Sequence, residues 1–375
     1  MSKYVDKHYK YIHIFFHDDI KFNPYVVYMV NDPMAGFNPD EHYFLTSKQK
    51  VYEEIKGYKN TALYDYIEPC EIINEVAPFC DWLIIHAIPT AWDMIRINPE
   101  YINKLVLRSW GHDISREIYH HFQPIKNIYK LIIKLKKRWK ETIRKARIIT
   151  GDNVTDIINI KNVFGENVRT MATQYPTDIT EQQLDEDRKT EKKHDKNITY
   201  VMVGHSGMKV NNHIKILKML EKWQNENIKI FIPLSYVHKP YENKIKKYVA
   251  KRWKNNKAEI VQKFIPYKEY VRFIKEMDIM IFDGKISYAL GNIKLGVFFK
   301  NKFFLNEKGV IYQGFNETAN PVTPTSKLNK MSYKEFISPV TYPNFENNGM
   351  RVHGKEYCFN EWKELFYKLD NEKIQ

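Results

Sequence analysis

One stretch constrains the fold of this chain more than any other: an apolar run, a glycine turn and a helical pattern follow one another directly. The apolar run covers residues 198–203, the turn is Gly-His-Ser-Gly at 204–207, and apolar residues then recur at helical spacing from Ile214 to Leu220. In α/β proteins, strand, glycine turn and helix in this order bring backbone N–H groups and a helix N-terminus up to a phosphate. The turn is neither Gly-x-Gly-x-x-Gly nor a Walker A loop. An ordinary βα turn is therefore the competing interpretation.

Short apolar runs bounded by polar residues recur along the chain, and each predicts a buried strand. In the N-terminal half the predicted strands are residues 11–16, 26–30, 82–86, 104–108 and 147–150. In the C-terminal half they are residues 228–232, 258–261, 278–282 and 302–305, with helical patterns at 241–253, 267–277 and 288–295. This alternation predicts two α/β domains with parallel sheets.

A charged segment separates the two halves. Residues 181–196 hold a single apolar side chain and are typical of a linker or exposed loop. We therefore predict domains at 1–180 and 197–375, the second closed by a C-terminal helix around residues 362–366. The Asp-Glu-Asp at 185–187 is formally a metal-binding DxD, but no strand precedes it, so solvated charge is the favoured interpretation.

Composition narrows the environment and the partners. The formal net charge is +14, which is typical of proteins that meet nucleic acid, an acidic membrane surface or phosphorylated substrates. The three cysteines, Cys70, Cys80 and Cys358, form no CxxC pair, which predicts a reducing compartment and no zinc site. No stretch reaches the apolar length of a membrane span, and the N-terminus lacks a signal-peptide core. We expect a cytoplasmic protein.

Residues 125–147 form a basic amphipathic pattern, with apolar residues at helical spacing. The basic face and its boundary carry Lys130, Lys134, Lys137, Arg138 and Trp139. Such a helix suits an anionic membrane surface. The alternative is a domain helix whose apolar face covers a sheet and whose basic face is solvated.

Several groups of residues resemble glycosyltransferase family 56. Trp110-Gly-His-Asp113 matches a Trp-Gly-x-Asp, and residues 203–214 match Val-Gly-x-Ser-Gly-x-x-x-Asn-x-His-Ile. The remaining matches, in order along the chain, are His13, Asp18, Asn23, Pro233, Tyr236, Tyr270, Asp278, Gly291, Leu305 and Asn306. The resemblance runs from about residue 11 to residue 309.

Family 56 enzymes transfer 4-acetamido-4,6-dideoxy-D-galactose from its TDP derivative to the lipid-linked disaccharide of enterobacterial common antigen. The resemblance therefore implies a GT-B glycosyltransferase: two Rossmann-like domains facing a central cleft, the nucleotide-sugar donor in the C-terminal domain, and the acceptor largely in the N-terminal one. It implies no cofactor and no obligatory metal. With the basic helix, it also implies a lipid-linked or glycan acceptor at the inner face of the bacterial cell membrane, where we expect the protein to be peripheral.

Departures from the family pattern leave the substrates open. His17, Lys21 and Phe22 stand where Ser, Pro and His are usual, and Met208-Lys209 replaces a common Asp-Arg. A transferase of capsule, O-antigen or lipooligosaccharide synthesis with another TDP-, UDP- or GDP-sugar is the alternative. A nucleic-acid-binding protein is a more remote one, because the basic residues are spread along the chain and no known nucleic-acid-binding signature is visible.

The leaving diphosphate needs positioned N–H groups, which we assign to the backbone at Ser206 and Gly207 and to the helix start at Gly291 and Asn292. The candidate donor-binding residues are Gly204, Ser206, Gly207, Asn211, His213, Tyr236, Gly291, Asn292, Asn306 and Glu307. Asn306 and Glu307 follow a strand and are candidates for ribose or sugar hydroxyls. First-turn packing is the alternative for His213, and a surface aromatic is the alternative for Tyr236.

The acceptor hydroxyl must lose a proton to a general base. Asp113 and Asp18 both follow predicted strands of the N-terminal domain, and His17 is a third candidate. Asp113 is slightly preferred because of its Trp-Gly-x-Asp context. A helix N-cap is the alternative role for Asp113, since a helical pattern begins at Ile114.

Overall fold

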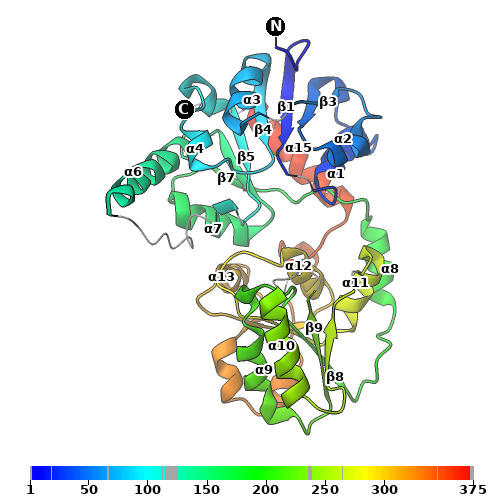
Figure 1. The fold of residues 1–375 in the computed structure, drawn as a ribbon. Helices are drawn as coiled ribbons and strands as arrows, with labels where there is room; N and C mark the ends of the chain where they lie inside the picture. The colour runs from blue at the N-terminus through cyan, green and yellow to red at the C-terminus, as the bar shows by residue number, and fades with distance from the viewer. Residues whose placement is uncertain are drawn as a thin grey trace. The chain divides into compact units, whose positions relative to one another are not determined.

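The computed structural model describes residues 2–371 except 18, 66, 112, 115–125, 235–238, 264 and 344; it leaves out the side chains of 126–133, 267, 268 and 347. The chain forms two compact units (Figure 1). Unit 1 joins Met1–Glu181 to His353–Gln375, and unit 2 is Gln182–Val352. Each unit is built on one sheet whose described strand pairs are all parallel.

The sheet of unit 1 has the strand order β3-β2-β1-β4-β5-β6-β7. Its strands are β1 (Tyr9–Phe15), β2 (His42–Thr46), β3 (Thr61–Leu63), β4 (Cys80–Ile85), β5 (Leu105–Arg108), β6 (Ile148–Gly151) and β7 (Thr170–Ala172). Along the chain, β2 and β3 are added on one side of β1, and β4, β5, β6 and β7 are then added on the other side. The strand order therefore reverses between β1 and β4, which is where open α/β sheets bind ligands.

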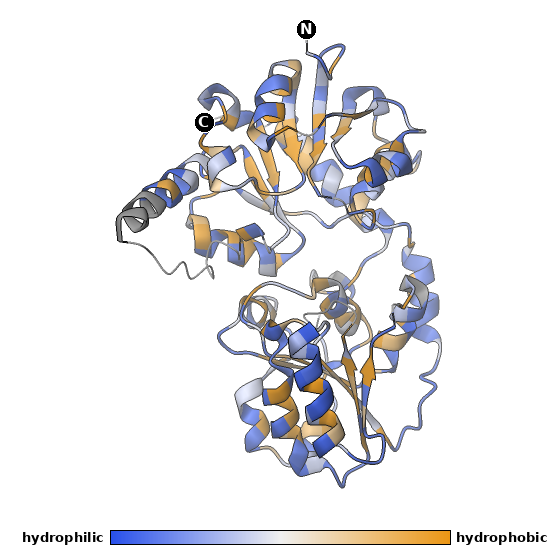
Figure 2. Cartoon of the chain, in the orientation of Figure 1, coloured by the Kyte–Doolittle hydropathy of each residue, from blue (hydrophilic) through white to orange (hydrophobic). Residues whose placement is uncertain are grey.

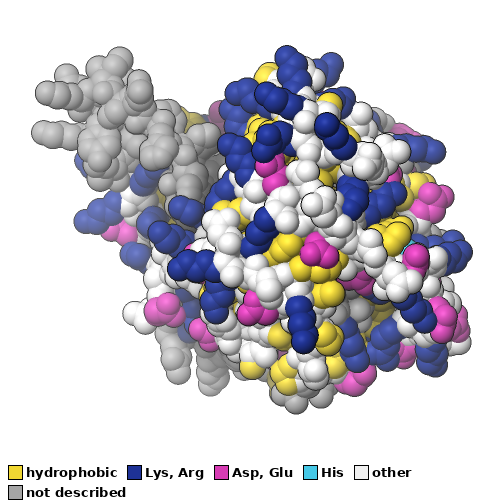
Figure 3. All heavy atoms as spheres, turned by 90° about the horizontal axis from the view of Figure 1, so that it is seen from below, with side chains coloured by type: hydrophobic (Ala, Val, Ile, Leu, Met, Phe, Trp, Pro, Cys, Tyr) yellow, Lys and Arg dark blue, Asp and Glu magenta, His cyan; other side chains and the backbone are white. Residues whose placement is uncertain are grey.

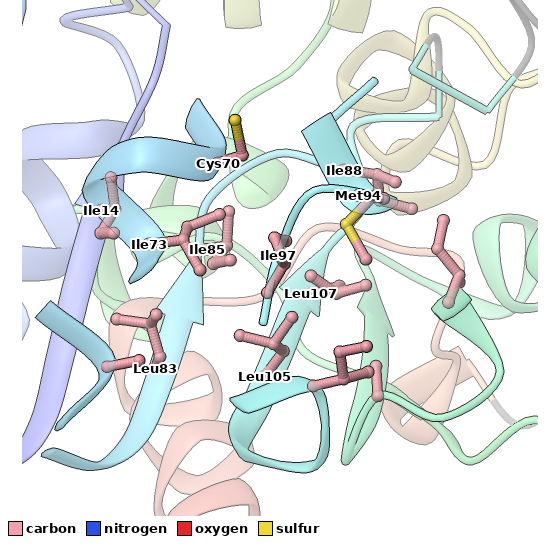
Figure 4. Packing of buried hydrophobic residues seen from close by; sticks show 14 of the residues in the cluster. Ile14, Cys70, Ile73, Leu83, Ile85, Ile88, Met94, Ile97, Leu105 and Leu107 are labelled. Carbon is pink, nitrogen blue, oxygen red and sulfur yellow. The ribbon is translucent and has the colours of Figure 1, made fainter. Parts of the chain in front are cut away.

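Alternate strand residues face opposite sides of this sheet, and each side has its own apolar core. On one side Ile14, Leu83, Ile85, Leu105 and Leu107 pack together (Figure 4). This side is covered by α3 (Pro69–Val76), α4 (Ala91–Met94), α6 (Lys126–Ile143) and α7 (Val154–Phe164).

The other side of the sheet is covered by α1 (Asn23–Asn31), α2 (Gln49–Ile55) and α15 (Lys355–Asn371). The prediction of a strand at residues 26–30 is wrong. Pro24 lies in the first turn of a helix, and Val26, Val27 and Val30 are buried along one side of it.

The C-terminal helix also departs from the prediction, because α15 belongs to unit 1 and not to the C-terminal domain. The Trp362 indole donates to Gln174 O at 2.8 Å, and the Tyr11 hydroxyl donates to Asp370 at 2.8 Å. Phe366 packs on the Tyr11 ring at 4.5 Å. The last helix thus completes the core of the first sheet, as the red segment beside β1 in Figure 1 shows.

The sheet of unit 2 has the order β10-β9-β8-β11-β12-β13. Its strands are β8 (Thr199–Val203), β9 (Ile228–Pro233), β10 (Ala258–Val261), β11 (Ile279–Phe282), β12 (Lys302–Leu305) and β13 (Thr323–Pro324). Its main helices are α9 (His213–Leu220), α10 (Lys239–Arg252), α11 (Tyr267–Glu276), α12 (Leu290–Phe298), α13 (Val310–Glu317) and α14 (Tyr333–Ile337). Here the strand order reverses between β8 and β11, so the predicted glycine turn leaves β8 at the reversal point.

The charged segment is partly helical. It contains α8 (Glu181–Lys189), which buries only Leu184 and is blue along most of its length in Figure 2, whereas the strands are orange. Asp185 of the formal DxD pairs with Arg188 one helical turn away, at 3.0 Å. Among the described residues, no helix combines the length and apolarity needed to cross a bilayer.

Candidate active site

The turn after β8 can be built only with glycine at its first position. Gly204 has φ +69°, and a Cβ there would lie 2.4 Å from His213 Nε2. Asn211, fully buried, holds the rest of the turn: its Nδ2 donates to Ser206 O at 3.0 Å and to Met208 O at 3.2 Å. Its Oδ1 accepts from the backbone N–H of His205 at 3.3 Å. Asn211 therefore shapes the turn, and its amide is engaged within the protein.

Two imidazoles support the turn: His213 is fully buried, and His205 is partly buried. Burial lowers the pKa of His205 to about 4 and that of His213 to about 3, so both rings are neutral near pH 7. His205 Nδ1 lies 2.9 Å from Asn211 Oδ1. Both ring nitrogens of His213 are buried and have no hydrogen-bond partner among the described residues. His213 packs behind Gly204, which agrees with first-turn packing.

Asp283, at the carboxyl end of β11, is the centre of a buried polar network in unit 2. Its fully buried carboxylate accepts from Thr325 Oγ1 at 2.6 Å, Lys215 Nζ at 2.7 Å, Asn212 Nδ2 at 3.1 Å and Asn306 Nδ2 at 3.2 Å. These partners come from the start of α9, the end of β12 and the segment after β13. Asp283 was not among the predicted site residues, and its only sequence signal is an Asp-Gly pair directly after an apolar run.

The start of α12 lies beside the glycine turn, because Tyr288, which precedes it, packs on the His205 ring at 5.1 Å. Gly291 and Asn292 are in the first turn of this helix, as predicted. A Cβ at Gly291 would meet nothing within 4 Å, so its backbone does not need glycine.

Two further predicted donor residues follow β12. Asn306 donates to Asp283, and hydrogen bonds, first from its own backbone N–H and then from Ser326, lower the pKa of the Glu307 carboxyl. Tyr236 lies outside the described residues. Lys209, an exposed residue between the turn and α9, makes no side-chain hydrogen bond or ion pair with any described residue.

In unit 1, His17 follows the carboxyl end of β1, and residues 109–111, 113 and 114 follow that of β5. The His17 ring meets Trp110 edge-on at 5.4 Å. Trp110 is fixed by its indole N–H, which donates to His86 O at 2.9 Å. The structure thus brings His17 and Asp113 to the same edge of the sheet; Asp18 lies outside the described residues.

The Asp113 carboxylate accepts hydrogen bonds from its own loop and from the loop after β4. It accepts from the backbone N–H groups of Ile88 at 3.0 Å, Trp110 at 3.0 Å and Ile114 at 2.9 Å, and from Ser109 Oγ at 3.1 Å. A carboxylate offers about four acceptor positions, so these donors fill it. The carboxylate thus holds together the loops at residues 86–88 and 109–114, while the backbone donors that a helix N-cap at Asp113 would bind lie outside the described residues.

A row of buried histidines crosses three neighbouring strands of unit 1. His13 Nε2 lies 3.0 Å from His42 Nδ1, His13 Nδ1 lies 3.1 Å from His86 Nε2, and His86 Nδ1 lies 3.3 Å from the Tyr175 hydroxyl. Burial lowers the pKa of His42 to about 3 and the pKa values of His13 and His86 well below their usual value. The row was not predicted from the sequence, because only the strand order β2-β1-β4 brings its members together.

The basic helix is confirmed as α6, but its predicted membrane-facing residues divide. Lys134, Lys137 and Arg138 are exposed, and the side chain of Lys130 lies outside the described ones. Trp139 is wrongly assigned to the surface: it is 1% exposed and packs edge-on against Phe164 at 5.1 Å. Trp139 belongs to the apolar core on that side of the sheet, and its indole N–H donates to Pro89 O at 3.4 Å.

A comparison with known families decides what this framework is. The profile of glycosyltransferase group 56, described as 4-alpha-L-fucosyltransferase, matches residues 93–336, well over half of the chain. The chain belongs to glycosyltransferase family 56. As a family 56 member it is a glycosyltransferase, which confirms the resemblance drawn from residues 110–113 and 203–214. The matches at His13, Asp18 and Asn23 lie before the matched region.

Solved structures place the family 56 chain in the GT-B fold. A glycosyltransferase from Rickettsia africae is 11% identical, with a TM-score of 0.66 over 98% of this chain and 100% of that one. Anabaena Alr3699/HepE with UDP and glucose is 8% identical, with a TM-score of 0.61 over 97% and 100%. A trehalose-6-phosphate protein from E. coli bound with UDP-2-fluoro glucose is 9% identical, with a TM-score of 0.58 over 98% and 100%. At these identities the likeness shows fold alone.

Proposed function

We propose that this family 56 glycosyltransferase moves a deoxysugar from a nucleotide diphosphate donor, bound by unit 2, to a lipid-linked or surface-polysaccharide acceptor. The observation that carries the proposal is the rigid glycine turn at the reversal point of the second sheet. Gly204 admits no side chain, Asn211 fixes the turn from within, and the start of α12 lies beside it. Positioned N–H groups and a helix N-terminus are what a leaving diphosphate needs.

Lys209 supplies the positive charge of the proposed donor site. Its ammonium group is exposed next to the turn and has no described anionic partner, whereas Lys215 is held by Asp283. Family members commonly carry Arg at the position of Lys209, and either cation can neutralise a phosphate.

The donor sugar we propose is a 6-deoxyhexose of galacto configuration. The matching profile is described as a fucosyltransferase, and fucose is 6-deoxygalactose. The 4-acetamido-4,6-dideoxy-D-galactose implied by the sequence resemblance shares the same missing 6-hydroxyl. Anabaena Alr3699/HepE was solved with UDP; for this chain TDP, UDP and GDP are all to be tested as carriers. That no metal is needed stays a prediction.

For the acceptor proton we propose His17 or Asp18 as the base and Asp113 as a positioning residue. All four acceptor positions of Asp113 are filled by fixed donors, so it would have to release one before taking a proton. His17→Gln and Asp18→Asn should each be compared with Asp113→Asn. Loss of the base lowers kcat by about 10²–10⁴-fold without a change in Tm, whereas Asp113→Asn should lower Tm as well. An Asp113→Asn enzyme with unchanged Tm and a loss of that size would make Asp113 the base.

Membrane association is proposed from the exposed basic side of α6. Lys134, Lys137 and Arg138 project to solvent on a helix that is otherwise seated on its own core. Juxtamembrane basic residues each contribute about 1 kcal/mol at an anionic surface. We propose that this face brings the enzyme to the inner leaflet, where a lipid-linked acceptor is presented.

The test is a thermal-shift titration of the full chain with TDP, UDP and GDP. A hundredfold excess over Kd stabilises the protein by about 2.7 kcal/mol, a readily measured shift. Lys209→Ala should weaken the shift, and Lys251→Ala, an exposed lysine on α10, should not. If no nucleotide diphosphate raised Tm while RNA or DNA did, the donor site would be refuted and the nucleic-acid alternative favoured. Against that alternative, the face in Figure 3 shows Lys and Arg interspersed with acidic and apolar side chains.

A further inference from the structure

Aromatic rings from three separate segments meet at the carboxyl edge of the first sheet. Trp110 lies 5.4 Å from Tyr175, 5.6 Å from Phe22 and 5.4 Å from His17, and Phe22 lies 5.3 Å from Tyr175. We name His17, Phe22, Trp110 and Tyr175 the aromatic cluster. Phe22 keeps 41% of its surface exposed although it packs against the Trp110 and Tyr175 rings. The cluster therefore presents to solvent an aromatic surface that its own packing does not bury.

The cluster is anchored to the interior by His86, which is fully buried at the end of β4. The backbone oxygen of His86 accepts from the Trp110 indole at 2.9 Å, and its Nδ1 meets the Tyr175 hydroxyl at 3.3 Å. Behind Tyr175 lies the fully buried Arg108, whose guanidinium carbon is 4.5 Å from the ring centroid. Two of the four rings are thus held in place before any ligand arrives, which lowers the ordering cost of binding.

The charges around the cluster are of both signs. Burial raises the pKa of Tyr175, Arg108 lowers it, and the carboxylates of Asp113 and Asp19 raise it. Asp152, which is 3.4 Å from Arg108, pairs with that cation. A neutral ligand whose hydroxyl groups both donate and accept hydrogen bonds suits such mixed surroundings.

We infer that the aromatic cluster is a carbohydrate subsite, in which the exposed face of Phe22 and the edge of Trp110 stack on the C–H face of an acceptor pyranose. This inference rests on the proposed function and adds the place and chemistry of acceptor recognition. A pyranose has one apolar C–H face and a rim of hydroxyls, so it fits fixed rings bordered by polar groups. A lipid chain would need a wider apolar surface than the exposed Phe22 and Ile20 provide.

The experiment is saturation-transfer NMR on the full chain with a panel of methyl pyranosides of glucose, galactose, N-acetylglucosamine and N-acetylmannosamine. Wild-type protein should saturate the C–H protons of one sugar face for at least one member of the panel. Phe22→Ala should weaken binding of that sugar about tenfold, the effect of one lost aromatic contact, and Phe22→Tyr should restore it. Tyr367→Ala is the matched control, because Tyr367 is exposed on α15 and outside the cluster.

Three results would overturn the inference: no saturation of any pyranoside by wild-type protein, equal saturation by Phe22→Ala, or a Phe22→Ala defect confined to phosphatidylglycerol vesicles. The nucleotide titration separates this from the proposed function. Phe22→Ala should keep the wild-type thermal shift with the nucleotide diphosphate. If wild type showed no such shift, the donor proposal would fail, whatever the sugars did.

Discussion

Five histidines with strongly lowered pKa values make the free energy of unfolding of this enzyme fall in mild acid by an amount that can be calculated. His13, His42 and His86 lie in unit 1, and His205 and His213 lie in unit 2. Burial holds each pKa far below the value of about 6.5 expected in the unfolded chain. Below pH 6.5 the unfolded state therefore binds protons that the folded state does not bind, and the free energy of unfolding drops as the pH falls.

The magnitude follows from the linkage relation. At pH 7.5 almost no histidine is protonated in either state, so this contribution is close to zero. At pH 5.5, roughly ten of every eleven unfolded copies of each histidine carry a proton, which costs the folded state about 1.4 kcal/mol per residue. The free energy of unfolding should fall by about 4 kcal/mol in unit 1 and by about 3 kcal/mol in unit 2. The total free energy of unfolding of a typical domain is only about 5–15 kcal/mol.

The assay is hydrogen exchange in urea at constant ionic strength, with peptides from β1 and β8 reporting the two units separately. His42→Phe is the internal test, since it removes one of the three row histidines of unit 1. It should remove about a third of the pH dependence that the row gives to this unit and leave unit 2 unchanged. A free energy of opening for β1 that stayed constant between pH 7.5 and 5.5 would refute the reasoning, because it would mean that the row is charged in the folded state.

Three further predictions concern the donor turn, its support and the basic helix. Gly204→Ala should destabilise unit 2 by about 2–5 kcal/mol, because positive φ and the clash with His213 add, and should abolish nucleotide binding. Gly291→Ala, whose Cβ meets nothing, should match wild type in both denaturation and thermal shift, and equal damage by the two would contradict the geometry. Asp283→Ala should lower the free energy of unfolding of unit 2 by about 3–5 kcal/mol in urea denaturation, because its buried donors lose their acceptor. Glu259→Ala, which removes one partner of an exposed ion pair, is the control and should cost under about 1 kcal/mol. Similar losses in the two variants would refute the network. Charge reversal of three exposed α6 residues should reduce sedimentation with anionic liposomes. The variant combines Lys134→Glu, Lys137→Glu and Arg138→Glu. A control with the same change in net charge, on α10, should bind more tightly than this variant, and equal binding would mean that net charge alone decides. The α10 control variant combines Lys244→Glu, Lys247→Glu and Lys251→Glu.

The parts of the fold that sequence could predict are those whose signal is local. The apolar runs at β1, β4, β5, β8, β9, β11 and β12 and the helical pattern at α6 each contain their own periodicity. The predicted strand at 26–30 failed because a short apolar run rich in valine has no period that distinguishes strand from helix. β2 and β3 were missed because neither stands out as a continuous apolar run.

The sequence alone could not show which residues lie side by side across the sheet. α15 has an ordinary amphipathic pattern that does not say which sheet it covers, so it was assigned to the nearer one in sequence. His42 and His86 are 29 and 73 residues from His13, and only the order β2-β1-β4 makes them neighbours. Gly204 was found because its turn is contiguous, whereas Asp283 acts on residues up to 71 positions away.

The donor turn shows why a glycine motif alone is weak and why its surroundings decide. A Gly-x-Ser-Gly turn after a strand is compatible with an ordinary βα connection, and nothing in those four residues fixes its shape. Here Asn211 holds the turn from inside, His213 fills the space that a side chain at position 204 would need, and Asp283 ties the start of α9 to β12. The Asn and His of the family pattern therefore support the turn from inside the protein. In the donor site proposed above, the backbone N–H groups and Lys209 are the groups that would meet the diphosphate. It follows that substitution of Asn211 should weaken nucleotide binding and turn stability together, whereas loss of Lys209 should weaken binding alone.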